Sequence, residues 1–515
     1  MHACPLCARN AVVGGILLLL AGLLGGTAAP LPAQTPTRQA DRFEGVRAFI
    51  RQVMQENELA SVVAAVAKDG RILWEEGFGM ADRERQIPAT PQTPYSLASI
   101  SKPMTAMAIM MLAEQGRIDL DRPVEEYLGG VRLTGLAGDA SGATVRRVLS
   151  HTAGLPLHYE FFYAGESHPP RNTDEGIARY AVLVNPPGEF YEYSNLGYGI
   201  LDRIVERVSG RSYDEFMQDE IFAPLGMSRT FVGTEAARLE GAAVRYDSRL
   251  QPIPFYDFDH RGGSAVFASA HDLVRFGLFH LGARSREQRQ VLSPGSIARM
   301  QQIATPGSTA QGYGLGWGIV EDDGGYRRVS HTGGMPGVAT VLNLFPSERL
   351  AVVVMTNKSD RVVNRIAEDV AGAVLPRYAA ALRERRARAA GTPTSDFAPT
   401  PELLGEWSGT IRTYQGTLPL TLIFQPDGDV HVRIGEQLRT LLNDAAFRDG
   451  QLTGRFAGHI PTPDAEHHRH IVLLNLRLRG DGRLGGQATA HTPSEPLYFA
   501  LTSYVELTKR AALTP

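Results

Sequence analysis

The chain has 515 residues, a length that suits two or three domains. Hydrophobic residues make up 43% and charged residues 21%, which is ordinary for a protein that folds around a buried core in water. The formal net charge is −3 and no large basic block is present, so the sequence suggests neither nucleic acid nor an anionic membrane as a partner.

Residues 1–33 have the layout of a secretory signal peptide, with a positive charge before the apolar stretch 11–26 and plausible cleavage near Ala29 or Ala33. We therefore expect an exported protein, periplasmic or secreted. An uncleaved N-terminal anchor is the alternative, because the apolar stretch is only slightly short for a spanning helix. Both cysteines precede that stretch, so the mature chain would have no disulfide, no thiol catalysis and no cysteine-ligated zinc.

The mature chain opens with a predicted helix, Arg42–Asn57, followed by two β-prone runs. These runs, Ser61–Lys68 and Arg71–Gly79, are joined by Asp69-Gly70, a strong hairpin signal.

A second predicted helix begins with the most informative stretch of the chain. Between Met104 and Leu112 apolar residues recur at helical spacing, which predicts a helix that buries one face, and Gly116 follows as a stop signal. Pro103 belongs in the first turn, because deeper in the helix its ring would clash with the preceding turn. The helix therefore begins near Ser99.

Ser99 and Lys102 are three residues apart, so they are neighbours on the surface of this helix. A hydroxyl beside an amine at a helix start predicts a nucleophile with its own base. The chain has only four lysines among its 52 basic residues, and a desolvated lysine can act as a base whereas arginine cannot lose its proton. The alternative interpretation is an ordinary surface lysine.

The middle of the chain is predicted to be mostly helical, with helices over 144–149, 197–209, 216–227, 268–280 and 293–302. His151, in a turn beside glycine and proline, is interpreted as a structural residue. The segment Leu157–Pro187 reads as long and irregular, and its aromatic residues suit either a pocket wall or simple packing.

Tyr193 and Asn195 flank the start of the helix 197–209 and point the same way in an extended turn. A phenol and an amide aimed into a cleft are able to move a proton and to orient a carbonyl group. The alternatives are a packing tyrosine and a helix-capping asparagine.

The first domain, predicted over 40–385, closes with strands and a helix, Arg361–Val374. The predicted strands are Gly312–Ile319, Arg327–Ser330, Val338–Phe345 and Leu350–Thr356, and His331-Thr332-Gly333-Gly334 directly follows the second of them. Strands at both ends around a helical middle predict an α+β fold, in which helices flank one antiparallel sheet beside a mostly helical subdomain. The active site would lie between the sheet and the helical part.

A predicted linker, 386–401, leads to a region of different character, 402–512. Seven short strand-like runs separated by Asp-Gly turns predict a small all-β barrel. A histidine-rich loop at 467–470 is interpreted as solvated, and neither a metal site nor a cofactor is predicted.

Three motifs in order, Ser99 with Lys102, Tyr193 with Asn195, and His331-Thr332-Gly333, resemble the serine penicillin-recognising family, which includes class C β-lactamases, DD-peptidases, esterases and D-aminopeptidases. The resemblance covers residues 42 to 376. It implies that Ser99 is acylated, that Lys102 activates it, that Tyr193 shuttles protons and that Asn195 holds the substrate.

The same resemblance implies an oxyanion hole formed by the backbone N–H groups of Ser99 and Gly334. His331 replaces the lysine that β-lactamases carry in this motif, and a mostly neutral histidine lacks the fixed charge that meets a substrate carboxylate. Some family peptidases carry a C-terminal lipocalin-like barrel, and the Gly405-Glu406-Trp407 opening is similar to a lipocalin start.

The sequence therefore predicts an exported serine hydrolase that forms an acyl-enzyme at Ser99 with small esters, amides or peptides. The alternatives are a true β-lactamase and a non-hydrolytic protein that binds acyl compounds or senses them. The oligomeric state is left open.

Overall fold

The computed structural model describes residues 41–168, 172–235, 239–389 and 397–510. The predicted signal peptide, 1–33, lies outside these residues, as do 390–396 of the predicted linker. Within the described residues no helix is both long enough and apolar enough to cross a bilayer.

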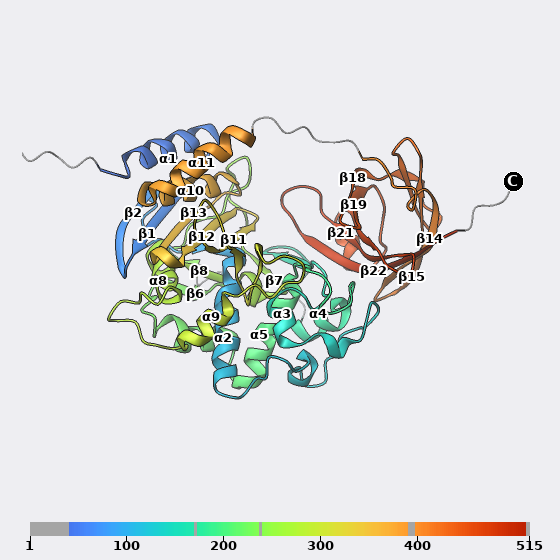
Figure 1. Ribbon diagram of the computed structural model, residues 1–515, viewed down its shortest axis with the longest axis horizontal. Coiled ribbons are helices and arrows are strands. Elements are labelled where there is room, and N and C mark those ends of the chain that lie inside the picture. The colour runs from blue at the N-terminus through green and yellow to red at the C-terminus, as the bar shows by residue number, and fades with distance from the viewer. Residues whose placement is uncertain (1–40, 169–171, 236–238, 390–396, 511–515) are drawn as a thin grey trace, which may run out of the picture. The chain divides into compact units, whose positions relative to one another are not determined.

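An antiparallel eight-stranded sheet forms the centre of the first part of the chain, in the order β3-β2-β1-β13-β12-β11-β10-β9 (Figure 1). The strands are β1 (Ser61–Lys68), β2 (Arg71–Asp82), β3 (Ile87–Pro88), β9 (Gln311–Tyr313), β10 (Gly318–Val320), β11 (Arg328–Met335), β12 (Val338–Phe345) and β13 (Leu350–Thr356). Because β1 pairs with β13, early and late strands complete one sheet, which confirms the predicted α+β design.

Both faces of this sheet are buried, and the two-residue period of a strand divides its side chains between two cores. Val62 and Val352 belong to the core under α1 (Glu44–Glu56) and α10 (Val362–Val374). Val63 and Val353 belong to the larger core on the opposite face, where α8 (Ala270–His280) packs. The strands β12 and β13 have the predicted bounds, because long apolar runs are typical of strands buried on both faces.

The helices α4 (Thr173–Tyr180), α7 (Arg261–Ser264) and α11 (Pro376–Ala389) were not predicted. Helix α11 packs against α10 and occupies the first four residues of the segment predicted as a linker (Figure 1).

The remaining helices lie between the strands of the sheet in sequence. They are α2 (Ser101–Glu114), α3 (Val145–Leu149), α5 (Asn195–Ser209), α6 (Tyr213–Met217) and α9 (Pro294–Met300). The predicted helix 216–227 is in fact α6 followed by one π-helical turn, and the predicted strand 312–319 is split into β9 and β10.

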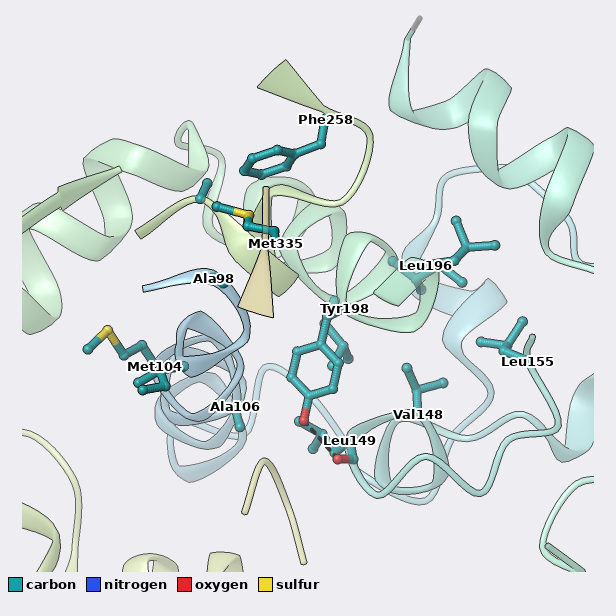
Figure 2. Packing of buried hydrophobic residues seen from close by; sticks show 14 of the residues in the cluster. Ala98, Met104, Ala106, Val148, Leu149, Leu155, Leu196, Tyr198, Phe258 and Met335 are labelled. Atoms are coloured by element: carbon teal, nitrogen blue, oxygen red, sulfur yellow. Dashed lines mark hydrogen bonds between the residues drawn. The ribbon is translucent and has the colours of Figure 1, made fainter. Parts of the chain in front are cut away.

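Helix α2 is enclosed on all sides, so the prediction that it buries only one face was wrong. Every residue from Ser101 to Leu112 is buried, because α5, α7 and α9 pack around the helix. Figure 2 shows part of this core, where Tyr198 of α5 extends toward Leu149 and donates a hydrogen bond of 2.8 Å to its carbonyl oxygen. Lys102 therefore stands on a helix that cannot shift without repacking the core, and the turn that carries Ser99 leads directly into it.

The segment Leu157–Pro187 is not irregular as predicted, because it contains β5 (Tyr159–Tyr163) and α4. Strand β5 pairs with β7 (Tyr256–Phe258) and with β22 (Phe499–Lys509) near the C-terminus. These partners are distant in sequence, so no local pattern marks the strand.

The C-terminal part of the chain forms a nearly closed antiparallel sheet in the order β17-β16-β15-β14-β22-β21-β20-β19-β18. Its other strands are β14 (Gly405–Thr413), β15 (Gly416–Phe424), β16 (Val430–Ile434), β17 (Thr440–Leu441), β18 (Asn443–Arg448), β19 (Gln451–Phe456), β20 (Ile471–Leu478) and β21 (Arg483–His491). Thr440 of the edge strand β17 donates a hydrogen bond of 3.0 Å to the carbonyl of Ala457, which directly follows β19. This bond links β17 to the opposite end of the strand order and helps to close the barrel. The predicted barrel is confirmed, although the short strands β17 and β18 were not predicted.

Candidate active site

Ser99 lies in a short 3₁₀ turn, Ala98–Ile100, that directly precedes α2. Ala98 has a φ of +47°, a left-handed conformation that costs a non-glycine residue about 1 kcal/mol or more. Ser101 holds the turn, because its hydroxyl donates to the carbonyl of Ala98 at 2.7 Å and accepts from the N–H of Val266 at 3.0 Å. The turn leaves Ser99 only partly buried at the mouth of the site.

Lys102 is fully buried, and its ammonium nitrogen makes three short contacts. Nζ lies 3.1 Å from Oγ of Ser99, 2.8 Å from Oδ1 of Asn195 and 3.0 Å from the carbonyl oxygen of Gly263. No carboxylate pairs with it among the residues that the structure describes. Burial lowers the pKa of Lys102 well below its usual value, so the amine is able to accept a proton.

Tyr193 and Asn195 come to the same place from the start of α5. Ser194 caps this helix by accepting from the N–H of Gly197 at 2.9 Å, and its own N–H donates to Nδ1 of His151 at 3.1 Å. His151 is buried beside the ring of Tyr193, at a centroid distance of 4.4 Å. His151 thus fixes the turn that carries Tyr193 and Asn195, in agreement with its structural interpretation.

Tyr193 makes a hydrogen bond with Ser99, and its ring lies 4.8 Å from Nζ of Lys102. Burial raises the pKa of the Tyr193 phenol, and the hydrogen bond to Ser99 offsets part of that rise. At neutral pH this phenol therefore keeps its proton, which makes it a donor toward Ser99 or a bound leaving group.

The motif His331-Thr332-Gly333-Gly334 lies inside β11. The prediction that it follows the end of a strand was therefore wrong. Strand β10 pairs with β11 only over Arg328–Ser330. From His331 onward, this edge of β11 has no partner strand among the described residues, and it runs along the turn that carries Ser99. A Cβ atom on Gly333 would lie only 2.1 Å from the carbonyl oxygen of Leu97, whereas one on Gly334 would meet nothing within 4 Å. Glycine at 333 therefore permits the close approach of β11 to the nucleophile.

His331 is neutral in this site. Its Nδ1 donates to the carbonyl of Thr332 at 2.7 Å, and its Nε2 accepts from the hydroxyl of Tyr313 at 2.8 Å. Burial and the nearby Lys102 lower the pKa of His331 to about 3. The position therefore supplies a fixed hydrogen-bonded ring in place of a positive charge.

Two cavities adjoin Ser99, and Ser99, Tyr193 and Gly334 line both of them. The first, about 300 Å³, has polar walls that also include Tyr191, Tyr313, Gly318, Ser330, His331 and Thr332. The second, about 250 Å³, is lined further by Leu157, Tyr159, Phe161, Asn195, His260, Ser264, Met335 and Leu497. We call the second one the aromatic cavity. A carbonyl group at Ser99 can thus place its two substituents in two different cavities.

The C-terminal barrel-like sheet contributes to this site. Leu497, just before β22, lines the aromatic cavity, and its carbonyl oxygen accepts a 2.8 Å hydrogen bond from the hydroxyl of Tyr163. Phe499 and Ala500 of β22 pair with β5, which carries Tyr159 and Phe161 into the same cavity wall.

All eight residues singled out from the sequence gather around one cleft: Ser99, Lys102, Tyr193, Asn195, His331, Thr332, Gly333 and Gly334. Of the two interpretations left open for the aromatic residues of Leu157–Pro187, a pocket wall is supported by Tyr159 and Phe161, which line the aromatic cavity. Sequence reasoning missed His260, Gly263 and Leu497. The one signal available for the first two was the adjacent acid and base in Asp259-His260, with Gly262-Gly263 following Arg261.

In the described part of the chain, no group of three or more histidine, cysteine, aspartate or glutamate side chains is arranged to hold a metal ion. The histidines at 467–470 instead make ring contacts, such as the stacking of His468 on Tyr498 at 3.5 Å.

This fold and these side chains define a serine hydrolase. A family model described as Beta-lactamase matches residues 46–375, and the chain belongs to that family.

A curated relative agrees with this assignment, and solved structures share the fold. "Penicillin-binding protein 4*" of Bacillus subtilis (strain 168) is 30% identical over 321 residues, which cover 57% of this chain and 67% of the relative. The octameric penicillin-binding protein homologue from Pyrococcus abyssi is 22% identical with a TM-score of 0.57, over 88% of this chain and 99% of that one. EstCE1, described as a hydrolase with promiscuous acyltransferase activity, is 21% identical with a TM-score of 0.53, over 64% and 98%.

Proposed function

We propose that the protein hydrolyses small esters, amides or peptides through an acyl-enzyme at Ser99. The observation that carries this proposal is the contact of 3.1 Å between Nζ of a fully buried Lys102 and Oγ of Ser99. A buried amine without a carboxylate partner among the described residues favours its neutral form, and a neutral amine is the form that accepts a proton.

In the first half of the reaction, Lys102 takes the proton of Ser99 as Oγ attacks the substrate carbonyl. The N–H groups of Ser99 and Gly334 donate to the oxyanion, where one such donor is worth about 3–4 kcal/mol. When the bond to the leaving group breaks, the leaving atom takes the phenol proton of Tyr193, and the proton on Lys102 restores the phenol. The acyl group is then bonded to Ser99.

In the second half, water attacks the acyl carbonyl. Its proton passes to the Tyr193 and Lys102 pair, the ester bond to Oγ breaks, and Ser99 recovers its proton as the acid leaves. Replacing Tyr193 with phenylalanine keeps the ring that packs on His151 but removes the proton, so we expect turnover to fall by about 10²–10⁴ with the fold intact. Unchanged turnover in this variant would remove Tyr193 from the mechanism.

The neutral His331 favours substrates without a carboxylate at this point of the site. Wild-type rates with p-nitrophenyl acetate, p-nitrophenyl butyrate, D-alanyl-p-nitroanilide and nitrocefin test this preference. We expect the esters or the anilide to be turned over faster than nitrocefin. A nitrocefin rate far above the other three would overturn the preference.

One observation favours a carboxylate-bearing substrate as a second candidate, namely a β-lactam or a peptide with a free C-terminus. Arg361 lines a larger cavity of about 710 Å³ together with Thr332 and Gly334, and a guanidinium is suited to a carboxylate. Glu495 lines the same cavity and opposes that attraction. If Arg361→Ala lowers the nitrocefin rate at least tenfold while the acetate rate is unchanged, the second candidate is preferred.

The predicted export is also part of the proposal, on the strength of the apolar stretch 11–26. Expression of the full chain in a bacterial host, followed by N-terminal sequencing of the mature protein, tests it. A mature start near residue 30 or 34 supports export with cleavage, and an intact start in the cytoplasm contradicts it. We further propose domain bounds of 40–385 and 402–512, with the latter lipocalin-like, and limited proteolysis within 386–401 tests them.

A further inference from the structure

A buried cluster of two histidines around one aspartate lies beside the active site and takes no part in the mechanism above. Oδ2 of Asp259 lies 2.5 Å from Nε2 of His158, and its Oδ1 lies 2.8 Å from Nδ1 of His260. The N–H of Glu160 also donates to Oδ1 at 3.2 Å. All three side chains of the cluster are at most 2% exposed.

His260 reaches the substrate side of this cluster, because its ring lines the aromatic cavity together with Ser99 and Asn195. A Cβ atom on Gly263 would lie 3.2 Å from Cδ2 of His260 and 3.4 Å from Nζ of Lys102. The ring and the candidate base therefore flank one small space, which the absence of a side chain at Gly263 leaves open.

The cluster fixes which nitrogen of His260 carries the proton. Asp259 faces donors on both of its oxygens, and the two histidines hold the pKa of its carboxyl below the usual value against the effect of burial. An ionised carboxylate only accepts, so Nδ1 of His260 must donate to it. Burial lowers the pKa of His260, which leaves the ring neutral with an unprotonated Nε2.

Nε2 of His260 makes no hydrogen bond within the described residues. The residue is only 1% exposed, but Nε2 is not a fully enclosed atom, so it is accessible from the aromatic cavity and a bound ligand is able to donate to it. The other walls of the cavity combine aromatic and aliphatic side chains with the polar groups of Ser99, Asn195 and Ser264, which suits a compact acyl group with a polar donor.

We propose that His260 is a substrate-binding residue that accepts a hydrogen bond from an N–H group next to the reacting carbonyl. The preferred acyl groups are then those of α-amino acids with a free or acylated nitrogen, seated in the aromatic cavity. Asp259 and His158 are positioning residues that keep Nε2 of His260 unprotonated. This inference rests on the proposed acyl-enzyme chemistry at Ser99.

The test compares two p-nitrophenyl esters of equal shape, measured for each enantiomer. One is the ester of N-acetylalanine, and the other is the ester of 2-methyl-4-oxopentanoic acid, in which CH₂ replaces the N–H. The ratio of their kcat/KM values, divided by the ratio of their rates of alkaline hydrolysis without the protein, reports the hydrogen bond. For the wild type we expect a ratio of about 10–100 for one enantiomer, the range for one buried hydrogen bond of about 1.5–3 kcal/mol.

His260→Asn keeps a side-chain N–H for Asp259 and removes the acceptor at Nε2, so the ratio should fall to about 1–3. Asp259→Asn leaves the imidazole free to carry its proton on Nε2, and should also lower the ratio at least fivefold. His459→Asn, at an exposed position in the C-terminal part, is the matched control and should leave the ratio unchanged.

A wild-type ratio near 1 for both enantiomers overturns the inference. A ratio that stays high in both His260→Asn and Asp259→Asn also overturns it. If one variant fails to fold, the ratio of the folded variant is compared with that of the wild type and decides the question. Failure of the proposed function looks different, because the wild type would then hydrolyse neither ester.

Discussion

Gly333→Ala tests how closely β11 must approach the nucleophile. The added Cβ would lie 2.1 Å from the carbonyl oxygen of Leu97 and 2.3 Å from Oγ1 of Thr340, and these two groups are already joined by a 2.9 Å hydrogen bond. Real Cβ contacts stay above 3.0 Å, so β11 and the turn that carries Ser99 must separate by about 0.9 Å.

A misplacement of this size matters because Ser99 and Gly334 must aim their N–H groups at one oxyanion. A shift of about 1 Å in such a constellation costs about 10²-fold in rate, equivalent to about 2.7 kcal/mol. We therefore expect kcat/KM for p-nitrophenyl acetate to fall about 100-fold in Gly333→Ala. Thermal unfolding, followed by circular dichroism, checks that the measured protein is folded.

Gly45→Ala is the matched control, because Gly45 is an exposed helical glycine whose Cβ would meet nothing within 4 Å. It should leave kcat/KM unchanged and stabilise α1 by about 0.5–1 kcal/mol. If folded Gly333→Ala retains kcat/KM within threefold of the wild type, the close approach is not needed for catalysis and the reasoning is refuted.

Three further predictions follow from the same structure. Because burial lowers the pKa of Lys102, kcat/KM should fall as the pH drops through that pKa. Lys102→Arg cannot lose a proton, so its rate should be about 10²–10⁴-fold lower than that of the wild type at every pH. A normal rate in this variant would exclude Lys102 as the base. Burial lowers the pKa of His280 to about 3, so between about pH 6.5 and 3 the unfolded chain binds one proton more than the folded chain, and the free energy of unfolding falls as the pH drops. Denaturant titrations should show that His280→Phe reduces the pH dependence of this free energy by about 1.4 kcal/mol per pH unit. An unchanged pH dependence would contradict this prediction. Leu497→Ala should enlarge the aromatic cavity and raise the kcat/KM ratio of p-nitrophenyl octanoate to acetate several-fold. Leu438→Ala, at an exposed residue of the loop between β16 and β17, should leave this ratio unchanged. Equal ratios in the two variants would show that the barrel does not limit the acyl group.

The site was largely predictable because its motifs are local. Ser99 and Lys102 lie within one turn, and Tyr193 and Asn195 belong to one capped helix start, so spacing alone places each pair. What spacing cannot give is the surrounding environment. The burial of α2 on every side depends on helices that follow it in sequence, and an amphipathic pattern reports only its most apolar face.

The features that were missed depend on contacts between distant segments. Strand β5 exists because β7 and β22 pair with it, and its aromatic residues carry no two-residue alternation. Asp259 and His260 are ordinary residues in the sequence, and only His158, one hundred and one residues away, makes them a cluster. Leu497 becomes part of the active site through a sheet that begins three hundred residues after Ser99.

Covalent labelling of Ser99 tests the central claim most directly. The wild-type protein would be treated with a fluorophosphonate probe, digested and mapped by mass spectrometry, with Lys102→Ala and Ser99→Ala in parallel. The account predicts one labelled peptide, modified at Ser99, whose labelling is lost in both variants. A wild-type protein that remains unlabelled, or that is labelled equally well without Lys102, would contradict it.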